Sequence, residues 1–447
     1  MSRTFTRLVA AVVASTLVVA GCSDPDEAAG DQDATPSTGP PAEVDHEALG
    51  LWDDGPCDPD REPLRIGLMT VFNSPVLSLE SHALALDASA EAFNDRGGAN
   101  GACIEVHACD DGANRDRSIS CVREIDEAGV VATVNDLGTA GMSEVSEAMA
   151  QLGIPRIASN VANEDWGDQN AYPLDASGTG FIFLIPQGLI EEGGSDIGLV
   201  RVDLAAASAL KGLVEDIYEG EATFPADLPV AAGTTDYTQF ILAAQEAGAE
   251  AIALALGEQE GLQVVRAGQQ LDSDLLIGSS LTTMAHGTVA ELGDYADQLV
   301  FLHSYPPATY DLPVYEVLRA DLAASGEEAL QPAQLQATAM RSWIGLYALL
   351  WMIRDDGMTE FTREGISEML DRAEDVPMLG IFGGEDWTPA HNHPGVFQRA
   401  GVDRWLVWRW DRNEAAPGGL EGNFVPGAEI SFDEVMCGTP LGGPEPC

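Results

Sequence analysis

Cys22 is the first of seven cysteines in this 447-residue chain, and it stands alone at the end of an apolar segment. Two arginines, Arg3 and Arg7, precede the apolar residues 8–20, and small residues close the segment. A basic start, a short apolar stretch and a small-residue exit are typical of a secretory signal, and this stretch is too short to span a bilayer comfortably. We therefore expect residues 1–21 to be a signal peptide and the rest of the chain to lie outside the cytoplasm.

The order Val19-Ala20-Gly21-Cys22 resembles a bacterial lipobox. The resemblance implies cleavage before Cys22 and lipidation of this cysteine, so that a lipid anchor holds the protein on the outer face of the cell membrane. An ordinary signal with a coincidental cysteine is the alternative. Residues 22–60 are rich in Asp, Glu, Pro, Gly and Ala and have no apolar period, which predicts a flexible stalk.

Six cysteines remain after Cys22, and an even number in an exported protein favours disulfides over metal ligands. Six cysteines allow about 15 pairings. We expect the pairs that join neighbours in the predicted layout, which are Cys57–Cys103, Cys109–Cys121 and Cys437–Cys447. A zinc site made by Cys103, Cys109 and Cys121 is the alternative, but their spacing matches no familiar arrangement of zinc ligands.

The charge balance restricts the partners of this chain. It carries 73 acidic and 21 basic residues, a formal net charge of −52, and Lys211 is its only lysine. Such a field repels polyanions, so we expect no nucleic acid as a partner. A small cationic or zwitterionic ligand is compatible with this charge, whereas an anionic ligand needs a dedicated local arginine. Solubility in a salty or acidic environment is the other explanation of the charge.

No group of residues has the pattern of a catalytic or metal site. His391-Asn392-His393 lies among Pro and Gly residues without an obvious third ligand, which favours a loop. The chain has no Gly-x-Ser-x-Gly turn, and neither Ser280 nor His286 has the context of a catalytic triad. Gly178-Thr179-Gly180 precedes a predicted strand, so it does not fit a nucleotide-binding turn. We therefore predict no catalytic residue, no metal and no cofactor.

From Leu64 onward, short apolar stretches alternate with segments whose apolar residues recur every three or four positions. The first kind indicates buried strands, and the second indicates helices that bury one face. Strands that alternate with helices require crossover connections, and hence parallel sheets with helices on both faces. Two successive runs predict two sheets, with strands at residues 64–71, 103–109, 130–135, 154–159, 197–202, 229–233, 251–256, 275–279 and 298–303.

The last third of the chain departs from this alternation. Residues 332–357 predict one long apolar-rich helix, and a second helix follows at about 361–374. RWLVWRW, at residues 404–410, alternates in the manner of a strand. Residues 437–447 have the composition of a loop-like tail with a cysteine at each end.

Several stretches resemble the solute-binding proteins of ABC importers, in the branched-chain amino acid and amide group with the type I periplasmic-binding fold. The similar stretches follow the order of that family from residue 64 to about 410, which is nearly the whole exported domain. They are LRIGLM (64–69), FNDRGGANG (93–101), CDDGANRDRSISCVREI (109–125), VVATVNDLGTAGMSEVSEAMAQLGIPRIAS (130–159) and TTDYTQFILAAQEAGAEAIALAL (234–256).

The resemblance implies an α/β fold of two doubly wound parallel-sheet lobes, joined by three crossings, with an inter-lobe cleft that holds the ligand. It implies that lobe one comprises residues 64–186 and about 309–385. Lobe two then comprises about 187–308 and 386–436, and residues 437–447 form the tail. Ligands of open parallel sheets bind beyond the carboxyl ends of the strands, which independently favours a site between the two lobes.

In lobe one the resemblance implies contacts to the ligand from three loops that follow strands, at Phe72, Asn73, Thr139, Ala140, Asn160 and Ala162. Thr139 matches a position whose hydroxyl holds a ligand carboxylate, beside a helix N-terminus that favours an anion. A plain helix cap is the alternative for Thr139. Phe72 and Asn73 are lining candidates that could instead pack their own loop.

In lobe two we expect contacts at Ala206, Gly257, Glu258 and Ser280. Here the chain departs from its family, because alanines replace the usual aromatic residue near 206 and serines replace the usual acidic partner of an ammonium near 280. Glu258 could supply that charge, or it could be a solvated helix start. An unpaired ammonium in a closed cleft is costly, and the alanines widen the cleft. A larger ligand, or an amide or urea-like one, therefore suits it better than an ordinary branched-chain amino acid.

The resemblance therefore implies a monomeric solute-binding lipoprotein that captures a small polar solute, an amino acid, amide or urea-like compound, for an ABC permease in the membrane. It is not expected to be an enzyme. An extracellular receptor domain that senses a ligand without transporting it uses the same fold and is one alternative. A secreted hydrolase is a less favoured one, because no nucleophile and base stand in a recognisable arrangement.

Overall fold

A computed structural model describes residues 45–72, 78–138, 140–159, 167–176, 180–203, 205–281, 284–390, 393, 395, 398–399, 401–439 and 441–443. Residues Asp45–Cys447 form one compact unit of the chain. Across these ranges, no helix has both the length and the apolar character needed to cross a membrane.

The first sheet has five strands in the order β2-β1-β3-β4-β5, and each neighbouring pair is parallel. Its strands are β1 (Leu64–Thr70), β2 (Ile104–Asp110), β3 (Ala132–Val134), β4 (Arg156–Ile157) and β5 (Ala171–Tyr172). All residues of β1 except Arg65 are buried, as expected for a strand with helices on both faces. The prediction of a parallel sheet is confirmed here.

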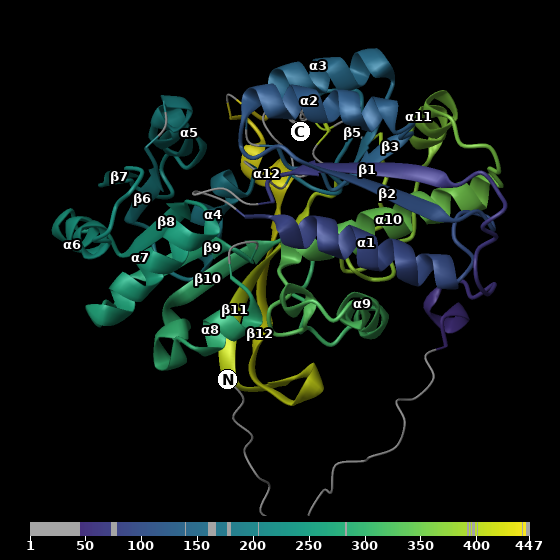
Figure 1. The fold of residues 1–447 in the computed structure, drawn as a ribbon. Helices are drawn as coiled ribbons and strands as arrows, with labels where there is room; N and C mark the ends of the chain where they lie inside the picture. Colours follow the sequence, from purple (N-terminus) through teal and green to yellow (C-terminus); the bar gives the residue numbers. More distant parts are fainter. Residues whose placement is uncertain are drawn as a thin grey trace, which may run out of the picture. The chain divides into compact units, whose positions relative to one another are not determined.

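Helices cover both faces of the first sheet (Figure 1). Helices α2 (Arg115–Glu127) and α3 (Met142–Leu152) pack together on one face, and α1 (Glu80–Asp95) packs against α10 (Ala337–Asp356) on the other. Two further helices complete this half, α9 (Pro313–Ala324) against α1 and α11 (Arg363–Arg372) against α10.

Helix α10 is shorter than predicted at its start. We expected a helix from residue 332, but residues Gln331 and Gln336 have extended backbones and the helix begins at Ala337. Pro332 disfavours helical geometry at the residue before it, which ends the preceding turn and delays the helix. Nearly all of α10 is buried, so its sequence is apolar on every side and not along a single stripe.

The second sheet has seven strands in the order β12-β11-β10-β9-β8-β6-β7. Five of them are parallel to each other: β6 (Ile197–Val202), β7 (Asp227–Val230), β8 (Ala251–Ala255), β9 (Leu276–Ser280) and β10 (Leu299–His303). Strand β7 begins two residues earlier than the predicted strand at 229–233 and ends at Val230. The two sheets together confirm the predicted α/β class of fold.

A long antiparallel hairpin that the sequence did not predict completes the second sheet. Strand β11 (Arg404–Ala416) extends beyond the predicted 404–410, and a turn at Pro417–Gly419 leads into β12 (Leu420–Ser431). Gly418 and Gly419 both have positive φ, which only glycine adopts readily, so the pair permits the turn. Polar, exposed residues at 412–414 hide the strand pattern, because the end of the hairpin has no core to face.

Two apolar cores lie on the two faces of the second sheet. One is covered by α6 (Thr238–Glu246), α7 (Glu258–Gln270) and α8 (His286–Ala290). The other is covered by α4 (Gly180–Glu191), α5 (Leu210–Ile217) and α12 (Phe432–Met436). Helix α4 packs on β8, β9 and β10, so the predicted end of the first lobe at residue 186 falls inside a helix of the second sheet.

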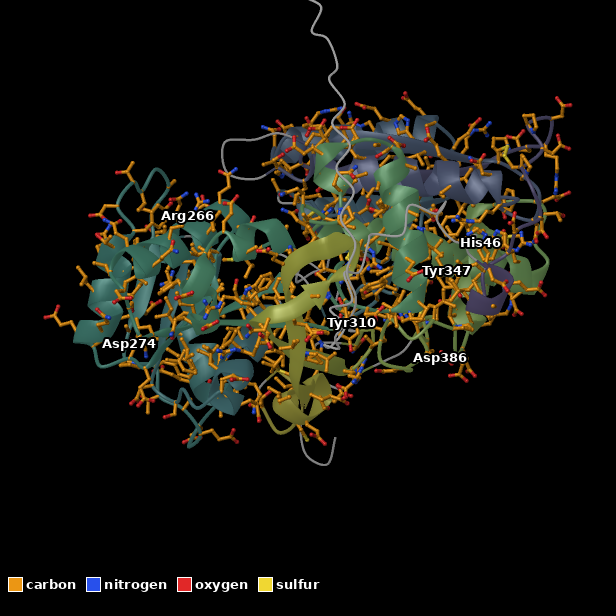
Figure 2. The ribbon with its side chains drawn as sticks, turned by 90° about the horizontal axis from the view of Figure 1, so that it is seen from below. His46, Arg266, Asp274, Tyr310, Tyr347 and Asp386 are labelled. Carbon is orange, nitrogen blue, oxygen red and sulfur yellow. A yellow bond between two sulfur atoms is a disulfide. The ribbon has the colours of Figure 1, made fainter. Side chains whose placement is uncertain are left out.

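Residues 45–60, which the composition assigned to the stalk, pack instead against the helices of the first sheet. The Trp52 ring stacks at 5.5 Å from the Phe93 ring and 6.2 Å from the Tyr347 ring, and the Arg354 guanidinium lies 4.6 Å from the Trp52 ring. Figure 2 shows Tyr347 beside the segment that carries His46. The prediction of a stalk is therefore wrong for this part, because its few apolar residues supply the packing without forming a period.

Two of the three predicted disulfides are confirmed. Cys57 is bonded to Cys103 and Cys109 to Cys121. Cys437 is also disulfide-bonded, and its predicted partner Cys447 lies outside the described residues. The disulfide between Cys57 and Cys103 fastens the N-terminal segment to the start of β2.

Removing each of the first two disulfides tests this fastening. The sequence separations are 46 residues for Cys57–Cys103 and 12 residues for Cys109–Cys121. Because a longer loop restricts the unfolded chain more, we expect C57A/C103A to lower the free energy of unfolding by about 4 kcal/mol and C109A/C121A by about 3 kcal/mol. Urea denaturation of both variants measures the losses. Unfolding of C57A/C103A at the wild-type urea concentration would contradict the fastening.

Candidate functional site

The sequence-predicted contacts that the structure describes lie where strands end or helices begin. Phe72 follows β1, Ala140 lies between β3 and α3, Gly257 lies between β8 and α7, and Ser280 is the last residue of β9. In each sheet these positions are at the carboxyl edge of the parallel strands, where ligands of such sheets bind. Asn73, Thr139, Asn160 and Ala162 lie outside the described residues, as do the side chains of Ala206 and Glu258.

Backbone contacts and burial fix the positions of the described contact candidates. The Phe72 backbone N–H donates to Asp110 Oδ1 at 2.9 Å, which ties its loop to the end of β2. Gly257 has an extended backbone immediately before α7, so α7 begins close to the end of β8. Ser280 is 1% exposed and lies beside a pocket described below. The use of these residues as ligand contacts stays a prediction.

A buried amide fixes the end of β3, and the sequence analysis missed it. Asn135 has a positive φ of 60°, and its Nδ2 donates to the Thr338 carbonyl at 2.9 Å and to Ser342 Oγ at 2.8 Å. The Ser342 hydroxyl in turn donates to the His82 carbonyl at 2.9 Å. This chain of hydrogen bonds joins the edge of the first sheet to α10 and α1, and so fixes the point from which the chain leaves β3.

Three segments connect the two sheets, and each of them lies near Asp175 or its partners. Asp175, after β5, accepts hydrogen bonds from Arg341 Nη2 of α10 at 2.5 Å and from the hydroxyl of Ser304 after β10. Its backbone forms a parallel bridge with Val402, in the segment before β11. In that segment Trp387 Nε1 also donates to the Pro173 carbonyl at 3.1 Å.

The pair of Asp175 and Arg341 is completely buried, with 0% exposure of both side chains. Burial alone would raise the pKa of Asp175, but Arg341, His303 and the Ser304 hydrogen bond outweigh it and hold this pKa below its ordinary value. Burial lowers the pKa of His303 to about 4, so this imidazole is neutral at pH 7. The connections between the sheets are therefore held by one neutralised ion pair.

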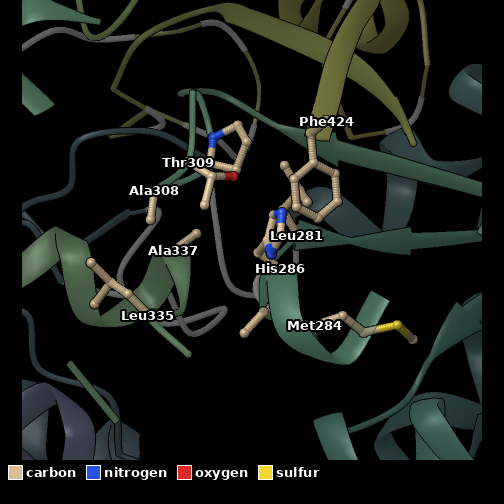
Figure 3. A pocket seen from close by; sticks show the side chains of 10 residues that line it. Leu281, Met284, His286, Ala308, Thr309, Leu335, Ala337 and Phe424 are labelled. Carbon is tan, nitrogen blue, oxygen red and sulfur yellow. The ribbon is translucent and has the colours of Figure 1, made fainter. Parts of the chain in front are cut away.

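A narrow pocket lies at the carboxyl end of β9, next to Ser280 (Figure 3). It is lined by the loop and helix start that follow β9, by the segment after β10, by residues at the start of α10 and by β12. His286, Thr309, Ala337 and Phe424 are among the residues that line it. The space for a water-sized sphere inside it is about 10 Å³, enough for about one water molecule.

The described histidine, cysteine and carboxylate side chains form no cluster that could bind a metal ion. Of the His391-Asn392-His393 motif only His393 is described. Its Nδ1 pairs with Asp433 at 2.8 Å and its Nε2 with the Gly401 carbonyl at 2.6 Å, which are structural contacts.

Asp175, Arg341 and His286 were not among the predicted site residues. One signal existed for Arg341, because it is a single charge inside the apolar stretch that forms α10. A charge in such a position is rarely buried without a partner. Nothing in the sequence around Asp175 or His286 distinguishes them, since their partners lie more than a hundred residues away along the chain.

A known family shares the sequence pattern of this chain. Residues 63–400 match a family model described as periplasmic binding protein. Comparison with curated proteins gives no match.

Solved structures with the same fold come from several bacteria. A fatty acid ABC transporter substrate-binding protein from Thermomonospora curvata has a TM-score of 0.68 and 18% identity, over 86% of this chain and 96% of that one. A leucine-, isoleucine-, valine-, threonine- and alanine-binding protein from Brucella ovis, in a closed conformation, has a TM-score of 0.66 and 15% identity, over 86% and 98%. A solute-binding protein from R. palustris in complex with 4-hydroxybenzoate has a TM-score of 0.64 and 14% identity, over 81% and 97%.

A double-mutant cycle tests the role of the ion pair. R341M leaves the Asp175 carboxylate buried without its cation, so we expect it to lower the free energy of unfolding by about 3–5 kcal/mol. D175N/R341M removes both charges while the amide oxygen introduced at position 175 can still accept from Ser304, and it should recover at least half of that loss. Chemical denaturation of both variants and of D175N measures the coupling. Losses that simply add would contradict the assignment of Asp175 and Arg341 as one interacting unit.

Proposed function

This chain belongs to the periplasmic binding protein family, and from that premise we propose that it captures a small solute outside the cytoplasm and delivers it to an ABC importer. The observation that carries the proposal is the family match over residues 63–400. It is supported by two sheets of mainly parallel strands, with the described contact candidates near the carboxyl ends of those strands. Solved relatives of this fold include proteins named for fatty acid, amino acid and 4-hydroxybenzoate binding.

The charges of the protein disfavour an anionic solute and are compatible with a neutral, zwitterionic or cationic one. The net charge of −52 opposes an anion unless an arginine receives it. Arg341 at the connections between the sheets is already paired with Asp175, and buried Arg156 behind the end of β3 is paired with Asp136 at 3.5 Å. An amino acid, an amide or a urea-like compound fits these conditions better than a carboxylate without a compensating positive charge.

Export and lipid attachment are part of the same proposal. The disulfides at Cys57–Cys103 and Cys109–Cys121 suit an oxidising compartment outside the cytoplasm. Lipidation of Cys22 would keep the protein at the membrane, near its permease. A monomer that contacts the permease needs no second copy of this chain.

A thermal-shift panel tests the proposed function. Residues 45–447 are a compact unit of their own and serve as the sample. The panel contains leucine, valine, threonine, benzamide, 4-hydroxybenzamide, urea, octanoate, benzoate, 4-hydroxybenzoate and putrescine. A solute at a hundred times its Kd stabilises the native state by about 2.7 kcal/mol and so raises the Tm. We expect this for at least one amino acid or amide, with the carboxylates weaker. A Tm unchanged across the whole panel would contradict solute capture.

A further inference from the structure

The hydrogen bonds around Thr309 fix which way its hydroxyl points. The Phe424 backbone N–H donates to Asn423 Oδ1 at 2.9 Å, and Asn423 Nδ2 donates to the Thr309 carbonyl at 3.0 Å. These two bonds determine the orientation of the Asn423 amide, so its Oδ1 is an acceptor. The Thr309 hydroxyl, 2.8 Å from this oxygen, must therefore donate its hydrogen to Asn423. The Thr309 hydroxyl oxygen can therefore act only as an acceptor toward a further partner.

The same reasoning fixes the tautomer of His286. Its Nε2 lies 2.8 Å from the Gly422 carbonyl, which can only accept, so Nε2 carries the hydrogen. Burial lowers the pKa of His286, so the ring is neutral at pH 7 and its Nδ1 is a bare acceptor. The side chain is held against the Trp410 ring at 5.0 Å, and the residue is 4% exposed. Nδ1 finds no hydrogen-bond partner among the described residues.

Among the described residues that line the pocket, only His286 and Thr309 have polar side chains, and each has an acceptor without a donated hydrogen bond. His286 and Phe424 lie on one side of the pocket and Ala308, Thr309 and Ala337 on the other (Figure 3). The other described lining side chains, those of Leu, Met, Ala, Pro and Phe, contribute no donor. A carbonyl or carboxylate oxygen placed here would face the lone pairs of Nδ1 and Oγ1, whereas a hydroxyl or amine N–H would complete the unpaired Nδ1.

We propose that this pocket is a specificity subsite that accepts a small hydrogen-bond donor, a hydroxyl or an amine N–H, carried by the apolar part of the solute. The proposal rests on the proposed function, since it describes which solutes that function selects. The space in the pocket suits a group about as large as a water molecule. A solute without the donor leaves Nδ1 buried and unpaired, which a site of this kind rejects.

Matched pairs of solutes test the subsite. Threonine and valine differ by a hydroxyl in place of a methyl group, and 4-hydroxybenzamide and benzamide differ by one hydroxyl. We expect the hydroxylated member of at least one pair to bind at least about tenfold more tightly to residues 45–447, measured as Kd by titration calorimetry. H286F replaces the acceptor by an apolar ring, and it should bring the two Kd values of that pair within about twofold of each other.

Further variants separate the subsite from simple damage to the fold. H286Q can keep a donor to the Gly422 carbonyl while it removes the Nδ1 lone pair, so it should lose the preference without a large fall in Tm. T309V should reduce the preference, and T309S, which restores a hydroxyl, should recover part of it. The ratio of the two Kd values is the readout, because a merely structural role for His286 would weaken both members of a pair equally.

The outcomes distinguish the two proposals. If the solutes of the panel bind but hydroxylated and plain members have equal Kd values, or if H286F keeps the wild-type ratio, the subsite is wrong while solute capture stands. If no solute in the panel raises the Tm or binds, the proposed function and the subsite are overturned together.

Discussion

Asp175 and Arg341 form the interaction on which the arrangement of this protein depends. The two sheets are built from separate stretches of the chain, and the segments between them meet at the Asp175 side chain and backbone. Because both side chains are completely buried, the pair survives only if each charge keeps its partner. Such a contact holds the connecting segments in register between the first sheet and the second sheet with its two apolar cores.

Much of the fold could be predicted from the sequence, because its strands are short apolar stretches with one simple pattern. β1, β6, β8 and β10 are nearly all buried, and each follows directly from its Leu, Ile, Val and Ala content. The hairpin of β11 and β12 was missed beyond residue 410, where exposed polar residues continue the strand without an apolar face. Residues 45–60 were assigned to the stalk because their overall composition is polar, and a single packed side chain such as Trp52 does not change it.

The candidate site was less predictable, for a different physical reason. Family resemblance placed Phe72, Ala140, Gly257 and Ser280 at strand ends or helix starts, and the structure describes them there. The hydrogen-bonding state of His286 and Thr309 depends on Gly422 and Asn423, which lie more than a hundred residues later in the sequence. A hydrogen bond between distant residues produces no pattern in the neighbouring sequence, whereas a buried helix or strand produces an apolar period. A site defined by which lone pairs remain free therefore requires the folded structure.

We propose that the two sheets with their helices close on a bound solute, and small-angle X-ray scattering measures this closure directly. The sample is residues 45–447, measured alone and with a saturating amount of the solute that raises the Tm most. Closure about the segments joined by Asp175 predicts a smaller radius of gyration and a shorter maximum dimension in the presence of solute. A bound solute, verified by calorimetry on the same sample, with an unchanged radius of gyration would contradict the account.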